Sequence, residues 1–195
     1  MARSYNNDGG GQQKIAPPAV AGLIKLAMNA AELNAMNEPE FRDALDGLWE
    51  HSPWVVDAAA AARPFDTRGD LSIAMWNAVL RAPLERRLAL LRAHPDLAGK
   101  LARAGALTDD SAKEQSSLGL DRLDDLEFEA FTSMNAAYRE RFGFPFIICV
   151  RDNTKASIRS AFERRLSHAA DAELQIALDE VRKIAEYRLR DRMES

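Results

Sequence analysis

The sequence of 195 residues contains a single cysteine, Cys149. One cysteine cannot form an intramolecular disulfide, and no group of thiolates is available to hold zinc or an iron–sulfur centre. We therefore expect a protein of a reducing compartment, and the cytoplasm is the natural location. Cys149 itself lies in an apolar stretch and is interpreted as a core residue without a special reactivity.

An excess of positive charge is also absent. The 26 Lys and Arg residues are outnumbered by 30 Asp and Glu, which gives a formal net charge of -4. Nucleic acids and anionic membranes are bound through strongly basic surfaces, so neither is an expected partner. No run of about 18 apolar residues could span a bilayer, and the first residues lack the apolar core and cleavage site of a secretory signal. We expect a soluble protein that is not exported.

The length fits one domain with a sizeable core, and nothing marks a linker between two. Residues 1–14 are rich in Asn, Gly and Gln and carry no periodic apolar pattern. The sequence therefore predicts a flexible N-terminal extension over residues 1–27 and one folded domain over residues 28–195.

Helix signals follow one another from about residue 37. Apolar residues recur at the spacing of one helix face, and polar residues or prolines stand where helices would begin. One such face is predicted for Leu123, Leu126, Phe131, Met134 and Tyr138. Helices are expected after caps at Asn37, Ser52 and Asp70, from Pro83 onward, and over residues 123–140, 154–167 and 171–190.

The exception is FGFPFIICV, residues 142–150. Its aromatic and β-branched content suits a buried strand, yet no other segment offers a strand partner. We predict an all-α, single-domain helical bundle with one buried extended segment at residues 142–150. The unpaired N–H and C=O groups of such a segment need partners, and a polar ligand is one way to supply them.

His94 ends one predicted helix and precedes Pro95, which disfavours helical geometry at the histidine. It could be presented to a cleft, or it could simply cap the helix C-terminus. Ser111 precedes Glu114 by three residues, which is the spacing of a capping box; alternatively, Glu114 and Gln115 open a helix whose N-terminus contributes to an anion pocket. Both alternatives remain open in each case.

Arg188 falls on the buried stripe of the last helix, seven residues after Val181. A guanidinium there requires an acidic partner, unless it reaches water along its own stem. His51 and His168 read as surface or capping residues. His94 and Asp96 flank a proline and are too few for a metal site, and the hydrolase and nucleotide-binding glycine motifs are absent. No metal is expected.

Taken together, several strings resemble one family. The sequence contains, in order, NEPEF, SPWV, RPF, AHPDLAGK, SAKEQSSLGL, MNAAY, RFGFPFIICVR and EVRKIAEYRL. It is similar to the 2-oxo-4-hydroxy-4-carboxy-5-ureidoimidazoline (OHCU) decarboxylases of urate degradation from about residue 28 onward. The resemblance implies an all-helical, homodimeric, cofactor-free enzyme that converts OHCU to (S)-allantoin and CO2. Ala98 departs from the family, in which glycine is common at that position.

The resemblance also implies the residues of the site. His94 and Glu114 match the catalytic positions, and the residues matching the substrate-binding positions are Pro95, Ser111, Gln115, Phe144, Phe146, Ile147, Ile148 and Arg188. Loss of CO2 leaves an electron pair that is spread over the ring and then protonated from one face. His94 can supply the acid or base, and whether it first acts as a base stays open. We expect Glu114 to fix the tautomer of His94 and raise its pKa. Arg188 and the amides of residues 144–148 would orient the substrate, and Phe144 and Phe146 would cover its ring.

Two other functions are compatible with parts of the sequence. The chain could be a non-catalytic helical interaction module in which His94, Glu114 and Arg188 form a structural cluster. It could also be a metal-dependent hydrolase built on His94 and Asp96. An interaction module would have no reason to bring three polar groups and an unpaired extended segment to one place. A metal-dependent hydrolase would need more metal ligands than the sequence offers.

Overall fold

A computed structural model describes residues 28–194 of the chain. The extension predicted for residues 1–27 lies outside this part. Within it all regular elements are helices, and β-type pairing is limited to one isolated bridge between Met28 and Met193. The predicted all-α class is confirmed. The helices are α1 (Ala30–Ala35), α2 (Glu38–Ala44), α3 (Trp54–Ala60), α4 (Arg68–Arg81), α5 (Leu84–Arg92), α6 (Lys100–Arg103), α7 (Asp109–Ser116), α8 (Asp125–Phe142), the 3-10 helix η1 (Val150–Asp152), α9 (Lys155–Arg165) and α10 (Ala170–Arg192).

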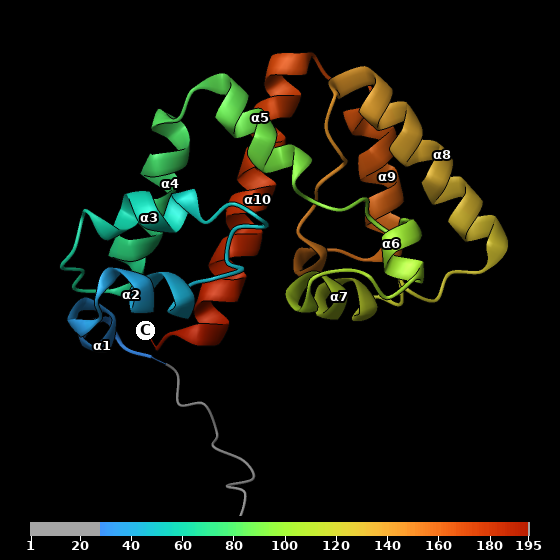
Figure 1. Ribbon diagram of the computed structural model, residues 1–195. Coiled ribbons are helices and arrows are strands. Elements are labelled where there is room, and N and C mark those ends of the chain that lie inside the picture. Colours follow the sequence, from blue (N-terminus) through green and yellow to red (C-terminus); the bar gives the residue numbers. More distant parts are fainter. Residues whose placement is uncertain (1–27, 195) are drawn as a thin grey trace, which may run out of the picture.

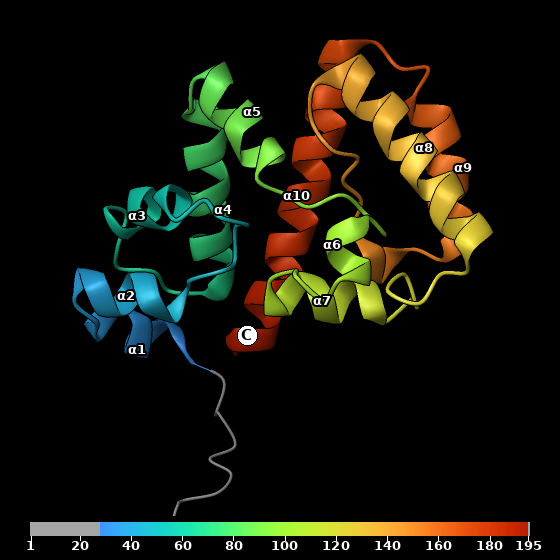
Figure 2. The ribbon, with the colours of Figure 1, turned by 45° about the vertical axis from the view of Figure 1, so that its right-hand side comes forward.

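The long helix α10 lies between two groups of helices. Figures 1 and 2 show α1 to α5 on one side of it and α6 to α9 on the other. Its buried stripe includes Ala177, Val181 and Arg188, as the helical spacing predicts. Because α10 touches both groups, any side chain on this stripe lies where residues from both halves of the chain can reach it. None of the described helices is both long and apolar enough to cross a bilayer.

The helix starts agree with the sequence in part. Asn37 caps α2 in a reciprocal capping box with Glu40, as expected. Thr67 caps α4, and Asp70 is the third helical residue of that capping box rather than the cap itself. The interpretation of Asp70 as the cap was therefore wrong by one turn, because both partners of a capping box are polar and the sequence does not say which comes first.

Three further details differ from the sequence prediction. Helix α1, capped by Asn29, was not expected. Helix α3 begins at Trp54 after Pro53, without a side-chain cap from Ser52. Leu126, predicted on the buried face of α8, is 80% exposed. Leu126 precedes Phe131 by five residues, about 140° around the helix, so it faces away from the buried stripe of Phe131, Asn135 and Tyr138.

The extended segment is present where the sequence predicts it. Helix α8 ends at Phe142, and Gly143 follows in the left-handed conformation with φ 75°. Residues 144–149 are buried and belong to no helix or strand. The segment is thus shorter than the predicted 142–150, because Phe142 ends α8 and Val150 begins η1. This segment passes between α8, α9 and α10, so its backbone forms part of the interior.

Candidate active site

His94 follows the last turn of α5 and is 7% exposed. Its Nδ1 lies 3.0 Å from the carbonyl oxygen of Leu90. A carbonyl only accepts hydrogen bonds, so Nδ1 carries the proton of the neutral ring and Nε2 keeps a free lone pair. The side chain thus hydrogen-bonds a carbonyl at the C-terminal end of α5 through Nδ1 and also offers a proton acceptor at Nε2. The two interpretations of His94 are compatible.

The ionisation of His94 differs from the expectation. Burial lowers its pKa to about 4, although the negative charge of Glu50 and the Leu90 carbonyl oppose this shift. The ring is therefore neutral near pH 7. We expected Glu114 to orient the ring and to raise its pKa, and this was wrong. Glu114 is paired with Arg188, and desolvation of the ring outweighs the nearby charge.

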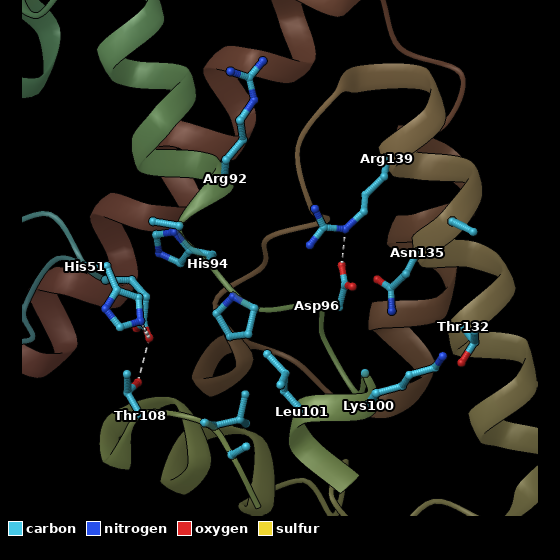
Figure 3. Close-up of a pocket in the computed structure, with 17 residues that line it drawn as sticks. His51, Arg92, His94, Asp96, Lys100, Leu101, Thr108, Thr132, Asn135 and Arg139 are labelled. Atoms are coloured by element: carbon cyan, nitrogen blue, oxygen red, sulfur yellow. Dashed lines mark hydrogen bonds and ion pairs between the residues drawn. The ribbon is translucent and has the colours of Figure 1, made fainter. Parts of the chain in front are cut away.

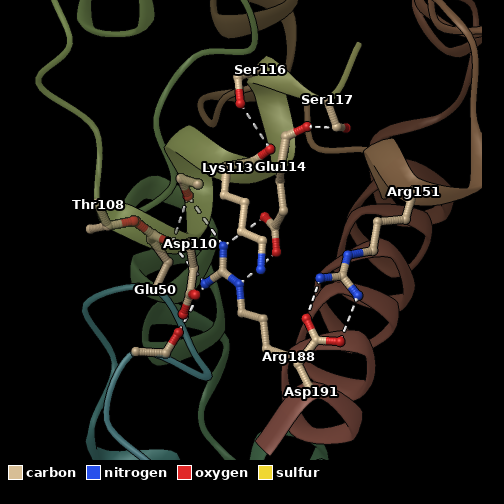
Figure 4. Close-up of polar contacts among 12 residues, drawn as sticks. Glu50, Thr108, Asp110, Lys113, Glu114, Ser116, Ser117, Arg151, Arg188 and Asp191 are labelled. Atoms are coloured by element: carbon tan, nitrogen blue, oxygen red, sulfur yellow. Dashed lines mark hydrogen bonds and ion pairs between the residues drawn. The ribbon is translucent and has the colours of Figure 1, made fainter. Parts of the chain in front are cut away.

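All five N–H groups of Arg188 are engaged by protein acceptors (Figure 4). Nε and one Nη2 hydrogen bind the two oxygens of Glu114 at 2.9 and 2.8 Å. Nη1 donates to Glu50 and to the carbonyl of Gly47, both at 2.9 Å, and Nη2 also reaches Ser111 Oγ at 3.2 Å. The side chain is 3% exposed, so it is a buried, fully paired arginine rather than one that reaches water.

Glu50 is the second carboxylate of this cluster and was not predicted. It lies between α2 and α3, is 2% exposed, and accepts hydrogen bonds from Thr108 at 2.7 Å and Ser111 at 3.0 Å besides that of Arg188. Burial would raise the pKa of Glu50, but the Thr108 hydroxyl and the charge of Arg188 together lower it below the usual value. Glu50 therefore remains ionised at neutral pH.

The capping-box interpretation of Ser111 and Glu114 is wrong. Helix α7 begins at Asp109 after Thr108, so both residues lie inside the helix and their side chains turn to Glu50 and Arg188. Gln115, one position on, accepts a hydrogen bond from the amide of Ala98 at 2.8 Å. Ala98 has φ 53°, a left-handed conformation that glycine adopts more easily.

These side chains and the extended segment enclose a cavity of about 40 Å³. It brings together nine of the ten residues proposed from the sequence. The exception is Phe144, which is buried against Tyr138 and Phe142 and does not line the cavity. The expectation that Phe144 covers a bound ring therefore has no support here. The lining residues are His94, Pro95, Leu97, Ser111, Glu114, Gln115, Phe146, Ile147, Ile148, Val150, Ile184 and Arg188.

The backbone of the extended segment supplies hydrogen-bond donors to this wall. Among the residues that the structure describes, no acceptor binds the N–H groups of Phe146, Ile147 and Ile148. The next amide, that of Cys149, donates to Glu180 at 2.7 Å. Buried amides without partners are rare, so a row of them beside a cavity indicates a site that binds a polar ligand.

Comparisons with known proteins identify the family. The sequence model of a family described as OHCU decarboxylase matches residues 34–190. The chain belongs to this family. It is 44% identical over 164 residues to the OHCU decarboxylase of Haloferax volcanii, covering 84% of this chain and 95% of that protein. The mouse OHCU decarboxylase is 37% identical over 164 residues, or 84% of this chain and 92% of the relative.

Two solved structures of this kind are similar to the chain. A crystal structure of (S)-allantoin synthase superposes with a TM-score of 0.67 at 32% identity, over 85% of this chain and 54% of that chain. A crystal structure of an OHCU decarboxylase in the presence of (S)-allantoin has a TM-score of 0.61 at 22% identity, over 80% of this chain and 97% of that chain. The second likeness shows that the fold is shared.

In this member of the OHCU decarboxylase family, a larger cavity of about 570 Å³ lies on the other side of His94 and Pro95. Figure 3 shows His51, His94 and Thr108 on one side and Asn135 and Arg139 on the other. Both cavities share the His94–Pro95 wall. Glu50 also lines the larger cavity, but Arg188, Glu114 and residues 146–148 line only the smaller one, which is therefore kept as the candidate site.

Asp96 does not support the metal-hydrolase alternative. Its carboxylate is paired with Arg139 at 2.7 Å. The part of the chain that the structure describes contains no group of three or more His, Cys, Asp or Glu side chains placed to hold a metal ion. The side chains of His94 and Asp96 therefore bind different partners, the Leu90 carbonyl and Arg139.

Sequence reasoning for this OHCU decarboxylase family member missed Glu50 because its partners are distant in the chain. Arg188 is 138 residues away and Ser111 is 61 residues away. One local signal was available: a charged residue directly follows the apolar pair Leu48 and Trp49. In the structure, the residue next to Glu50 is also unusual: His51 has φ 45°, a strained conformation for a residue with a side chain.

Proposed function

We propose that this chain decarboxylates OHCU to (S)-allantoin and CO2 in urate degradation, and that the cavity between His94 and Arg188 is the active site. The family membership supports the reaction. The observation that carries the site is the meeting of three groups in one cavity: a neutral histidine, a buried arginine and unpaired backbone amides. A carboxylated, ureido-substituted ring needs a proton donor or acceptor, a cationic partner and neutral donors of this kind.

Substrate binding has to rearrange the Arg188 cluster. A cavity of about 40 Å³ holds roughly one water molecule, for which the volume in the liquid is about 30 Å³. Moreover, Arg188 has no free N–H group. Glu114 is 11% exposed and Glu50 only 2%, so Glu114 is the partner that can move outward. The substrate carboxylate then takes its place on the guanidinium.

His94 acts first as a base in this proposal. At neutral pH its ring is uncharged, and the Leu90 carbonyl keeps the proton on Nδ1. Nε2 can accept the proton of the substrate's 4-hydroxyl group as the bond to the carboxylate carbon breaks. The electron pair left by CO2 spreads over the substrate's own ring, and the protonated His94 then returns a proton to one face of it. The ring serves as the electron sink, so no cofactor is required.

We also propose that the enzyme is a cytoplasmic homodimer. The resemblance to the OHCU decarboxylase family implies the dimer, and the single cysteine favours a reducing compartment. Three large apolar side chains, Ile73, Leu80 and Leu84, are exposed on α4 and α5 and could contact a second copy. Light scattering at micromolar concentration is expected to give twice the chain mass, and a monomer mass would contradict this part.

The reaction is tested with substrate generated freshly from urate. Without an enzyme to protonate one face of the ring, decarboxylation would give racemic allantoin, so circular dichroism of the product distinguishes catalysis from uncatalysed decay. We expect optically active (S)-allantoin and an accelerated loss of OHCU. A product without optical activity, formed at the spontaneous rate, would favour the helical interaction module instead.

A further inference from the structure

A second buried polar cluster lies behind the extended segment, away from His94. Arg165 of α9, Glu173 of α10 and Tyr138 of α8 are all buried. Arg165 Nε donates to Glu173 at 2.7 Å and its Nη2 donates to the Tyr138 hydroxyl at 3.2 Å. Tyr138 also donates to Glu173, and the second oxygen of Glu173 is 2.8 Å from His168 Nδ1. The proposed reaction uses none of these groups.

This cluster touches the wall of the substrate cavity at one point. The remaining donor of Arg165, Nη1, binds the carbonyl oxygen of Ile147 at 2.7 Å. The same guanidinium lies over the Phe146 ring, 4.5 Å from its centroid. A buried ion pair is costly to desolvate and is often replaceable by apolar residues without loss of stability. Its contact with the cavity wall therefore suggests a role besides stability.

Because the peptide group is planar, the contact of Arg165 with the Ile147 carbonyl also fixes the direction of the Ile148 N–H. The bond between Ile147 and Ile148 is trans, since the one cis bond among the described residues is Arg63–Pro64. In a trans peptide the C=O of one residue and the N–H of the next point in opposite directions. Arg165 draws the Ile147 carbonyl toward α9, so the Ile148 N–H points away from α9. Ile148 lines the substrate cavity, and its N–H has no acceptor among the described residues.

We propose that Arg165 is a positioning residue: by holding the Ile147 carbonyl, it aims the Ile148 N–H at the substrate. The amide donates to an oxygen of the bound ring, where negative charge grows as CO2 leaves. The cationic partner on the carbonyl also polarises the peptide and strengthens its N–H as a donor. This inference rests on the proposed function, because it assigns the amide to the same cavity.

Arg165→Lys and Arg165→Met test the inference, with Tyr138→Phe as the matched control. Tyr138→Phe removes one buried hydroxyl of the same cluster but leaves the contact between Arg165 and Ile147 intact. All variants are assayed well below their melting temperatures. We expect kcat to fall by about 10- to 100-fold for both Arg165 variants, the range for a displaced catalytic group, and by less than about threefold for Tyr138→Phe. The pH profile should keep its shape, because His94 is untouched.

A purely structural role gives a different result. In that case Arg165→Lys would lose stability but keep the wild-type kcat and KM while folded, which would overturn the inference. If Arg165→Met does not fold, Arg165→Lys and Tyr138→Phe decide the question, and equal kcat values for those two would also overturn it. Failure of the proposed function is distinct: the wild type itself would then form no (S)-allantoin.

Discussion

Arg188 binds both oxygens of Glu114 through Nε and Nη2, at 2.9 and 2.8 Å, and so joins α10 to α7. This paired contact closes the cavity that contains His94. It also occupies the planar fork that a substrate carboxylate would use. Glu114 is therefore a competitor of the substrate before it can take any other part in the reaction.

Glu114→Gln tests this competition. Glutamine has one acceptor oxygen, so it cannot bind the guanidinium at two points, and the substrate carboxylate meets a weaker competitor. We expect KM to fall several-fold while kcat stays within about threefold of the wild-type value, because Glu114 takes no part in proton transfer. The acid limb of the pH profile should stay in place, since Glu114 is not the charge that acts on His94. A KM above the wild-type value would contradict the competition.

Arg188→Lys tests the fork itself. Lysine keeps the charge but has three donors on one nitrogen, which cannot serve Glu114 and Glu50 together. We expect KM to rise by a factor corresponding to about 1–3 kcal/mol, and the melting temperature to fall because a buried carboxylate loses its partner. Arg182→Lys is the matched control on the same helix, since Arg182 is 42% exposed and pairs with Glu186 at the surface. Wild-type kinetics for Arg188→Lys would remove Arg188 from substrate binding.

His94→Asn should abolish most of the turnover and preserve the fold. Asparagine keeps hydrogen bonding but cannot exchange a proton near neutral pH, so we expect a loss of about 10²–10⁴-fold in kcat. In the wild type the base is active when unprotonated. The acid limb of its pH profile should therefore lie near pH 4, the pKa of His94, and not near 6.5. A limb near 6.5 would show that another group, or a solvated His94, controls the rate.

The same pKa predicts how stability depends on pH. The unfolded chain protonates His94 near 6.5 and the folded protein only near 4. Its contribution to the free energy of unfolding is thus complete above pH 6.5 and declines as the pH falls toward 4, by about 3 kcal/mol in all. Denaturant unfolding of the wild type and His94→Asn at pH 7 and pH 4 measures this difference. An equal loss in both proteins would contradict it.

Glu50→Gln should move the acid limb to lower pH. The carboxylate of Glu50 raises the pKa of His94 against the effect of burial, so removing its charge lowers that pKa further. Thr108 and Ser111 donate to different oxygens of Glu50, and glutamine has one acceptor oxygen, so it keeps only one of these hydrogen bonds. Arg188 also loses an ionic partner, and stability should fall. Thr108→Val is the control, because it removes one hydrogen bond to Glu50 without a change in charge. A limb that moves upward would contradict this assignment.

The sequence by itself determined the features that depend on neighbouring residues. Helical periodicity placed Arg188 on the buried stripe of α10, and composition identified the buried extended segment after Phe142. Both inferences rest on local rules, because the 3.6-residue repeat and the burial of apolar runs involve residues close in the chain. The family resemblance added the identity of the cavity residues, and Phe144 alone is absent from the wall.

Only the tertiary structure decided which groups meet. The spacing of Ser111 and Glu114 fits a capping box and a binding site equally well, and the packing of α7 against α10 turned both side chains toward Arg188. The tertiary fold also brought Glu50, 138 residues away from Arg188, to the cluster, and it buried His94 deeply enough to lower its pKa. Desolvation and ion pairing depend on what surrounds a group in space, and no local pattern in the sequence contains that information.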